Sequence, residues 1–175
     1  MEGSMSIETS FKGSPNSRTS EVLVTFSAKW RDPLLSGSIK CVLRRRYPKS
    51  LVPTRMYLYI AAPFSQVIGV SNIARLMDVS IAKAKTLQEK TRVDDEELNQ
   101  YFDGYDKVGC YFIDETDLFY PPIHLEVLRE SWSFYPPQSF VSLSREAVQW
   151  FAANGTTNSS VALRRGDASM PTGKK

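Results

Sequence analysis

Three consecutive arginines, Arg44, Arg45 and Arg46, are the clearest candidates in this sequence for binding an anionic ligand. Guanidinium groups bind phosphates bidentately, and alternate residues of a strand point to the same face. A strand over positions 40–46 would therefore place Arg44 and Arg46 on one side and Arg45 on the other. This spacing suits neighbouring phosphates of a nucleic acid, and it equally suits a solvated basic edge.

Other bases and a tryptophan lie near the three arginines. Positions 29–55 hold eight basic residues and one acid, a net charge of +7, whereas positions 94–130 carry −9. Aromatic rings stack on unpaired bases, which favours single-stranded RNA as the ligand. We predict that nucleic acid binds to Lys29, Trp30, Lys40, Arg44, Arg45, Arg46 and Lys49. We also expect Lys29, Lys40, Arg44 and Arg46 to line one cleft.

Several classes of function lack the residues that they need. The sequence has one histidine, His124, two cysteines, Cys41 and Cys110, and neither a Walker A nor a GxGxxG motif. We therefore predict no metal, no cofactor and no catalytic residue, and two buried free thiols in a reducing compartment. No apolar run reaches the roughly 20 residues that cross a bilayer, and the Ser-rich start lacks the apolar region of a secretory signal. These features predict a cytoplasmic protein without a membrane partner.

The elements that must position these residues follow from the apolar periods. The 175 residues predict one domain over 21–153, with flexible polar tails at 1–20 and 154–175. Strands are expected over 22–26, 40–46, 56–60, 67–76 and 107–119, the last as one long strand or a pair. Helices are expected over 28–35, 79–91, 94–102 and 144–153. The order predicts an α+β domain built on a small, mostly antiparallel sheet or a partly open barrel.

Two further clusters have mainly structural interpretations. The acids at 94–97 fit the first turn of a helix, where the macrodipole favours them, and one of them could face the cleft as a lone general base. Trp132, Phe134 and Tyr135 precede two prolines and are expected to hold a loop against the core.

A succession of short motifs resembles a known family. In order they are Phe26-Ser27-Ala28-Lys29-Trp30, Leu34-Leu35-Ser36-Gly37, Leu43-Arg44-Arg45-Arg46, Leu58-Tyr59-Ile60-Ala61-Ala62-Pro63, Tyr101-Phe102-Asp103-Gly104 and Pro136-Pro137-Gln138-Ser139-Phe140. Together they resemble the ASCH domain of the PUA-like superfamily over residues 22–143, in a branch with a PPQSF ending. The resemblance implies a PUA-like small β-barrel of about five to seven strands with flanking helices, and RNA-related work.

The enzymatic members of that family carry a G-x-K-x-x-T/E-x-R pattern. With Gly37 and Arg44 aligned, the lysine position holds Ile39 and the Thr/Glu position holds Val42; a one-residue shift recovers Lys40 and leaves Leu43 at the Thr/Glu position. Apolar side chains cannot activate a nucleophile or carry a proton.

The main prediction is therefore a non-catalytic recognition module for RNA or a nucleotide, which could be regulatory in transcription or translation. The alternatives are an enzyme acting on a modified nucleoside or RNA (an N4-acetylcytidine amidohydrolase or a ribonuclease) and a protein-interaction module.

Overall fold

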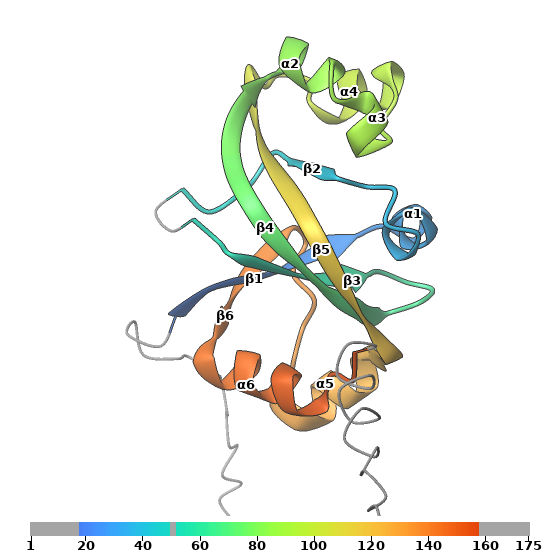
Figure 1. Ribbon diagram of the computed structural model, residues 1–175, viewed down its shortest axis with the longest axis vertical. Coiled ribbons are helices and arrows are strands. Elements are labelled where there is room, and N and C mark those ends of the chain that lie inside the picture. The colour runs from blue at the N-terminus through green and yellow to red at the C-terminus, as the bar shows by residue number, and fades with distance from the viewer. Residues whose placement is uncertain (1–17, 50–51, 158–175) are drawn as a thin grey trace, which may run out of the picture.

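The fold is one curved six-stranded sheet with helices at both ends, seen in a computed structural model that describes residues 18–49 and 52–157 (Figure 1). The strand order is β2-β5-β4-β3-β1-β6, and neighbours are antiparallel except β1 and β3, which are parallel. The strands are β1 (Arg18–Phe26), β2 (Cys41–Arg44), β3 (Arg55–Ile60), β4 (Gln66–Ser80), β5 (Lys107–His124) and β6 (Phe140–Ser144). The helices are the 3₁₀ turn η2 (Ala28–Trp30), α1 (Arg31–Leu35), α2 (Ile81–Lys85), α3 (Gln88–Thr91), α4 (Asp95–Tyr101), α5 (Leu125–Trp132) and α6 (Arg145–Asn154).

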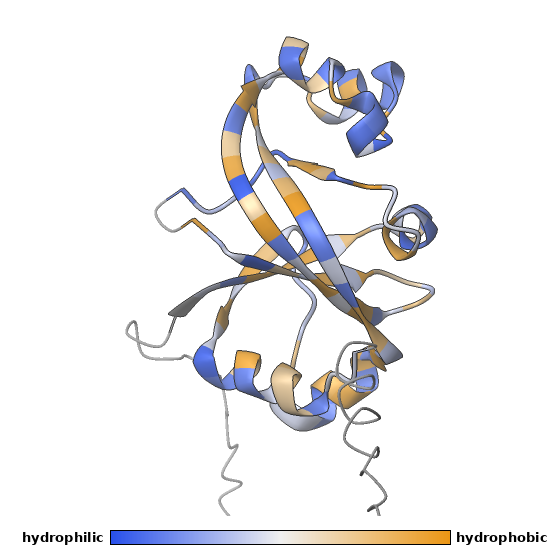
Figure 2. Ribbon diagram, in the orientation of Figure 1, coloured by the Kyte–Doolittle hydropathy of each residue, from blue (hydrophilic) through white to orange (hydrophobic). Residues whose placement is uncertain are grey.

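The two longest strands, β4 and β5, connect the two ends of the molecule (Figure 1). Hydrophobic and hydrophilic residues alternate along both strands, as expected where one face of a sheet is covered (Figure 2). Helix α2 begins directly after β4, and α5 begins directly after β5. The long pair therefore carries helices α2 to α4 at one end and α5 at the other.

Three buried clusters hold these parts together. One draws on all of the first five strands and includes Phe26 of β1, Val42 of β2 and Tyr111 of β5. A second packs α5 and α6 against the sheet around Tyr57 and Phe151, whose rings stack with centroids 4.5 Å apart. The third packs the helices α2 to α4 against β2 and β5; its buried members are Cys41, Leu43, Val79, Ala84, Leu87, Leu98, Phe102, Val108 and Cys110.

The sheet is open in the described part of the chain. Strands β2 and β6 are its two edges, and no ladder between described residues joins them. The six strands and the mixed α+β architecture agree with the sequence prediction, but the barrel that the resemblance implies is not seen to close among the described residues.

Most predicted elements are present, and the differences have local causes. The helix expected over 79–91 begins only at Ile81, because pairing with β5 keeps β4 extended as far as Ser80, and it is divided into α2 and α3. Ser80 then caps the short helix α2 by accepting a hydrogen bond from the Lys83 amide (3.1 Å). β2 ends at Arg44, two residues earlier than predicted, and the segment 107–119 belongs to one long strand. Helix α5 and strand β6 were not predicted.

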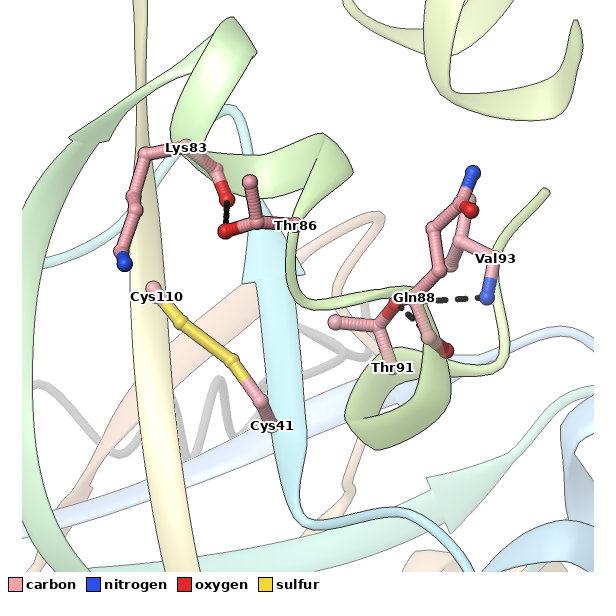
Figure 3. Close-up of a disulfide and its surroundings, with 7 residues drawn as sticks. All are labelled: Cys41, Lys83, Thr86, Gln88, Thr91, Val93 and Cys110. Carbon is pink, nitrogen blue, oxygen red and sulfur yellow. Dashed lines mark hydrogen bonds between the residues drawn. A yellow bond between two sulfur atoms is a disulfide. The ribbon is translucent and has the colours of Figure 1, made fainter. Parts of the chain in front are cut away.

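Cys41 and Cys110 form a disulfide, so the prediction of two free thiols is wrong. The antiparallel register places Cys41 opposite Phe112 and Cys110 opposite Leu43, which makes the two cysteines diagonal neighbours with Cα atoms 6.4 Å apart. Figure 3 shows the bridge between β2 and β5 beside the segment that carries Thr86 and Thr91. The spacing of two cysteines in a sequence does not reveal that their strands will pair.

Described secondary structure and hydrogen bonds occur on both sides of the predicted domain limits of 21 and 153. β1 begins at Arg18, and Thr156 accepts a hydrogen bond from the Tyr120 amide (2.8 Å), next to an isolated bridge between Phe119 and Thr157. Residues 1–17 and 158–175, where most of the predicted tails lie, are outside the described residues.

Candidate functional site

A pocket of about 520 Å³ opens between the end of β1, strand β2 and the helices α3 and α4. Thr25 and Phe26 come from β1, the segment after it adds Ser27, Lys29 and Trp30, and β2 forms a wall from Cys41 to Arg44. The opposite side consists of Thr91, Val93, Glu97, Tyr101 and Phe102, with Ala61 and Gln138 also contributing. A pocket of this volume is large enough for a nucleotide-sized ligand.

Arg44 is the half-buried cation of this pocket. It shares a face of β2 with Val42, its Nη2 donates to the Thr25 carbonyl (2.8 Å), and its guanidinium lies 4.4 Å from the Phe26 ring centroid. Burial lowers the pKa of Arg44, while the hydroxyl of Tyr101 opposes that shift. Its Nε atom is buried and makes no hydrogen bond with any described residue. A desolvated cation with a spare donor in a pocket is suited to an anionic ligand.

Arg45 also lines the pocket, whose wall includes residues from both faces of β2. Its ring partner Tyr101 packs against the cluster of Cys41 and Leu43, whereas Arg44 lies against Phe26 of the other cluster, so the two arginines keep to different faces as the alternation predicts. The Arg45 guanidinium stacks on Tyr101, 4.4 Å from the ring centroid, and lies 5.7 Å from the ring of Tyr105. Stacking fixes the plane of the guanidinium and leaves its edge available for a phosphate.

Lys29 and Glu97 form an ion pair at the pocket, and Lys29 also lies 4.8 Å from the ring centroid of Trp30. Glu97 belongs to the acidic first turn of α4, which Asp94 caps by accepting a hydrogen bond from the Glu97 amide (2.8 Å). One acid of the predicted run therefore lines the pocket beside a lysine. A carboxylate next to an ammonium is a combination that can accept and return a proton.

The structure brings together four of the seven predicted binding residues, Lys29, Trp30, Arg44 and Arg45. Lys40 lies instead in a shallow hollow with α1 and residues 114–118 of β5. Arg46 is exposed outside the pocket lining, and Lys49 lies over the ring of Tyr47 (5.1 Å to its centroid). The expectation that Lys40 and Arg46 line the same cleft as Lys29 and Arg44 is therefore wrong. Whether any of these residues binds RNA stays a prediction.

The apolar residues at the family's polar positions also line the pocket. Ile39 and Val42 are both buried in its wall. The alternative alignment, with Lys40 as the lysine, places that residue outside the pocket. Neither alignment supplies the polar pair of the enzymatic pattern at this site.

Sequence reasoning missed Tyr101, Thr91 and Gln138 as pocket residues. Gln138 belongs to the PPQSF segment, which was recognised only as part of the resemblance. Tyr101 and Thr91 come from helices packed over β2, and their approach to Arg44 and Arg45 depends on tertiary contacts across more than 40 positions of the chain. Tyr135 was expected to pack against the core but is 78% exposed, whereas Trp132 and Phe134 do pack against the α5–α6 cluster.

Two kinds of feature are absent from residues 18–49 and 52–157. The described residues contain no cluster of three or more His, Cys, Asp or Glu side chains that could hold a metal ion. No described helix is long and apolar enough to cross a membrane.

Comparison with known proteins relates this fold and sequence to a family. An ASCH domain-containing ribonuclease from Zymomonas mobilis is 25% identical over 132 residues, covering 74% of this chain and 88% of the relative. The crystal structure of ASCH from the same organism superposes with a TM-score of 0.72 at 22% identity, covering 78% of this chain and 96% of that structure. The chain is therefore similar to ASCH domain proteins in sequence and in fold. No protein-family model matches it.

Variant structures of the Zymomonas ASCH protein give the same result. A serine-to-alanine variant has a TM-score of 0.71 at 21% identity and covers 80% of this chain and 99% of that one. A tyrosine-to-phenylalanine variant has a TM-score of 0.70 at 22% identity and covers 79% and 100%. The mixed α+β architecture with six strands is thus the ASCH architecture, as the sequence resemblance predicted. The assignment to a branch with a PPQSF ending stays a prediction.

Proposed function

We propose that this ASCH domain homologue binds single-stranded RNA in the pocket beside β2 and cleaves it. The observation that carries the proposal is Arg44, a desolvated cation whose Nε has no hydrogen-bond partner among the described residues and whose neighbours include an open, stacked Arg45. The similarity to a ribonuclease supports the enzymatic alternative over the non-catalytic module that the sequence alone favoured.

The two arginines would hold adjacent phosphates of the strand. Bidentate hydrogen bonds from Arg45 would neutralise the charge that grows on the oxygens of the scissile phosphate as the reaction proceeds, and the spare donor of Arg44 would bind the next phosphate. Trp30 at the rim supplies an aromatic face for a base. The pocket thus combines charge for the phosphate with a flat apolar surface for the nucleobase.

Glu97 and Lys29 would carry the protons. Glu97 takes the proton from the ribose 2′-hydroxyl, and the 2′-oxygen forms a bond to the adjacent phosphorus. The bond between phosphorus and the 5′-oxygen of the next nucleotide breaks, and Lys29 protonates that oxygen. The products are a 2′,3′-cyclic phosphate and a free 5′-hydroxyl, and the ion pair between Lys29 and Glu97 places the acid and the base side by side before the reaction.

A labelled single-stranded RNA incubated with the purified full chain tests this proposal, with product ends identified by mass spectrometry. The Glu97→Gln variant should cleave roughly 100- to 10,000-fold more slowly, the usual contribution of a general base. It should still bind RNA, because the arginines remain. Glu96→Gln is the matched control, since Glu96 is the exposed neighbour on the same helix and does not line the pocket.

The outcomes separate the three candidate functions. Cleavage that depends on Glu97 and not on Glu96 supports the ribonuclease. Binding without cleavage by the wild type would favour the non-catalytic RNA module, for which the apolar Ile39 and Val42 in the pocket wall argue. Neither binding nor cleavage of RNA would overturn the proposal and leave a protein-interaction module.

A further inference from the structure

The rim of the pocket continues into a second aromatic and cationic pair that lies outside the pocket. The guanidinium of Arg31, at the start of α1, lies 4.7 Å from the ring centroid of Phe64, in the turn between β3 and β4. Figure 1 shows α1 and this turn on the same side of the molecule. Both residues adjoin the pocket through the chain, because Trp30 precedes Arg31 and Ala61 begins the turn that holds Phe64.

This pair is placed and exposed in a way that suits a flat ligand. Phe64 is 37% exposed, and the Arg31 side chain retains 31% exposure, so neither is covered by the rest of the fold. The Ala61 carbonyl accepts hydrogen bonds from the amides of Phe64 and Ser65 (both 3.3 Å), which fixes the turn. Asp32 binds Nη1 of Arg31 (2.9 Å), and the Nε of Arg31 makes no hydrogen bond with any described residue. The guanidinium therefore stays in place without using all of its donors.

We infer that Arg31 and Phe64 form a second subsite, which stacks the base of the nucleotide next to the one in the pocket. The inference rests on the proposed function, since it requires a single strand of RNA to leave the pocket over Trp30. Bases stack on aromatic rings and on arginine planes alike, and this stacking tolerates any base. The subsite would thus add affinity for a strand over a single nucleotide, without adding sequence preference.

The test compares ligands that do and do not reach beyond the pocket. One probe is a short 2′-O-methyl RNA, whose blocked 2′-oxygen prevents cleavage, and the other is the set of common ribonucleoside 5′-monophosphates used as competitors. Phe64→Leu keeps apolar bulk but removes the ring, and it should weaken binding of the strand about tenfold. The same variant should leave the affinity for monophosphates unchanged. Phe64→Tyr keeps the ring and should bind the strand as the wild type does.

A matched control comes from a similar pair elsewhere in the fold. Arg75 lies 4.2 Å from the ring centroid of Phe112 on the β4–β5 pair, and neither residue lines the pocket. Arg31→Lys keeps the charge but loses the stacking plane and should weaken binding of the strand, whereas Arg75→Lys should not. Thermal unfolding of each variant verifies that the fold is retained.

Three results would overturn the subsite, and a fourth would contradict the proposed function. Equal affinity of Phe64→Leu and wild type for the strand would overturn the subsite. Equal losses for the strand and the monophosphates would also overturn it, because Phe64 would then act on the pocket itself. Loss of strand binding in Arg75→Lys as well would show a general effect and would count against it. Absence of RNA binding by the wild type is a different result, since it contradicts the proposed function before any variant is compared.

Discussion

The salt dependence of RNA binding provides a quantitative test of which cations face the ligand. Each phosphate contact to a single strand adds about −0.7 to the slope of log affinity against log salt. The pocket holds three cations, but Lys29 is paired with Glu97, which leaves Arg44 and Arg45 to neutralise phosphates. The expected slope for the wild type is therefore about −1.4, so that a tenfold rise in salt weakens binding about 25-fold.

The perturbation is Arg45→Gln. This change removes one of the two contacts, so the slope should flatten to about −0.7 and a tenfold rise in salt should weaken binding only about fivefold. The protein should remain folded, because Arg45 is exposed and its stacking on Tyr101 is worth about 1 kcal/mol at most at such a site. The assay is fluorescence anisotropy of a short labelled 2′-O-methyl RNA, measured across a series of salt concentrations.

Arg46→Gln is the matched control, since it removes the same charge from the next residue, which lies outside the pocket. Its slope should equal that of the wild type. The assignment would be refuted if Arg45→Gln kept the wild-type slope, or if Arg46→Gln flattened it as much. A wild-type slope of −2 or steeper would indicate that the more distant lysines also reach the strand, as the sequence alone predicted for a cleft with three or four contacts.

Two further predictions concern the supporting structure. The Cys41–Cys110 disulfide closes a loop of 69 residues, so reduction should lower the free energy of unfolding by about 4 kcal/mol. Denaturant unfolding with and without a reductant measures this difference, and equal unfolding curves would contradict the bridge. The Tyr47 hydroxyl donates to the Asp78 carboxylate, and this hydrogen bond raises the pKa of Tyr47 to about 12 from its usual value of 10.0. Because the bond needs the protonated hydroxyl, its contribution to the stability of the fold is complete below pH 10 and is lost as the pH rises through 12. In a tyrosinate absorbance titration, Asp78→Asn should return the pKa of Tyr47 toward 10. An unchanged pKa would refute the hydrogen bond as its cause.

The sequence predicted those strands and helices whose apolar run or capping residue lies within the element itself. The apolar run at 56–60 is buried β3, and Ser144 caps α6 by accepting a hydrogen bond from the Ala147 amide (3.2 Å). Helix α5 was missed although Leu125 and Leu128 form its buried face, because its eight residues follow directly from a long strand that has the same apolar content. Strand β6 was missed because its burial comes from pairing with β1 across more than 100 positions.

The candidate site shows the same division between local and distant causes. Alternation along β2 correctly separated Val42 and Arg44 from Cys41 and Leu43, and these two pairs do pack in different clusters. The same alternation extends one residue beyond the ladder between β2 and β5, because Arg45 stacks on Tyr101 beside Cys41 and Leu43 while Arg44 lies against Phe26. That both arginines nevertheless line one pocket depends on the helices packed over β2, and this packing is not visible in the strand pattern.

The charge pattern allowed one acid of the run at 94–97 to face the cleft, but it did not show which acid or why. The sequence separates a basic segment from an acidic one, which suggested two faces of the molecule. The helical end instead folds back over β2, because Leu98 and Phe102 of α4 are buried in the same cluster as Cys41 and Leu43. That packing places Glu97, one turn from Tyr101, opposite the arginines. The hydrophobic side of a seven-residue helix thus determines that a carboxylate meets the basic strand, and it brings Glu97 into the same pocket as Arg44 and Arg45.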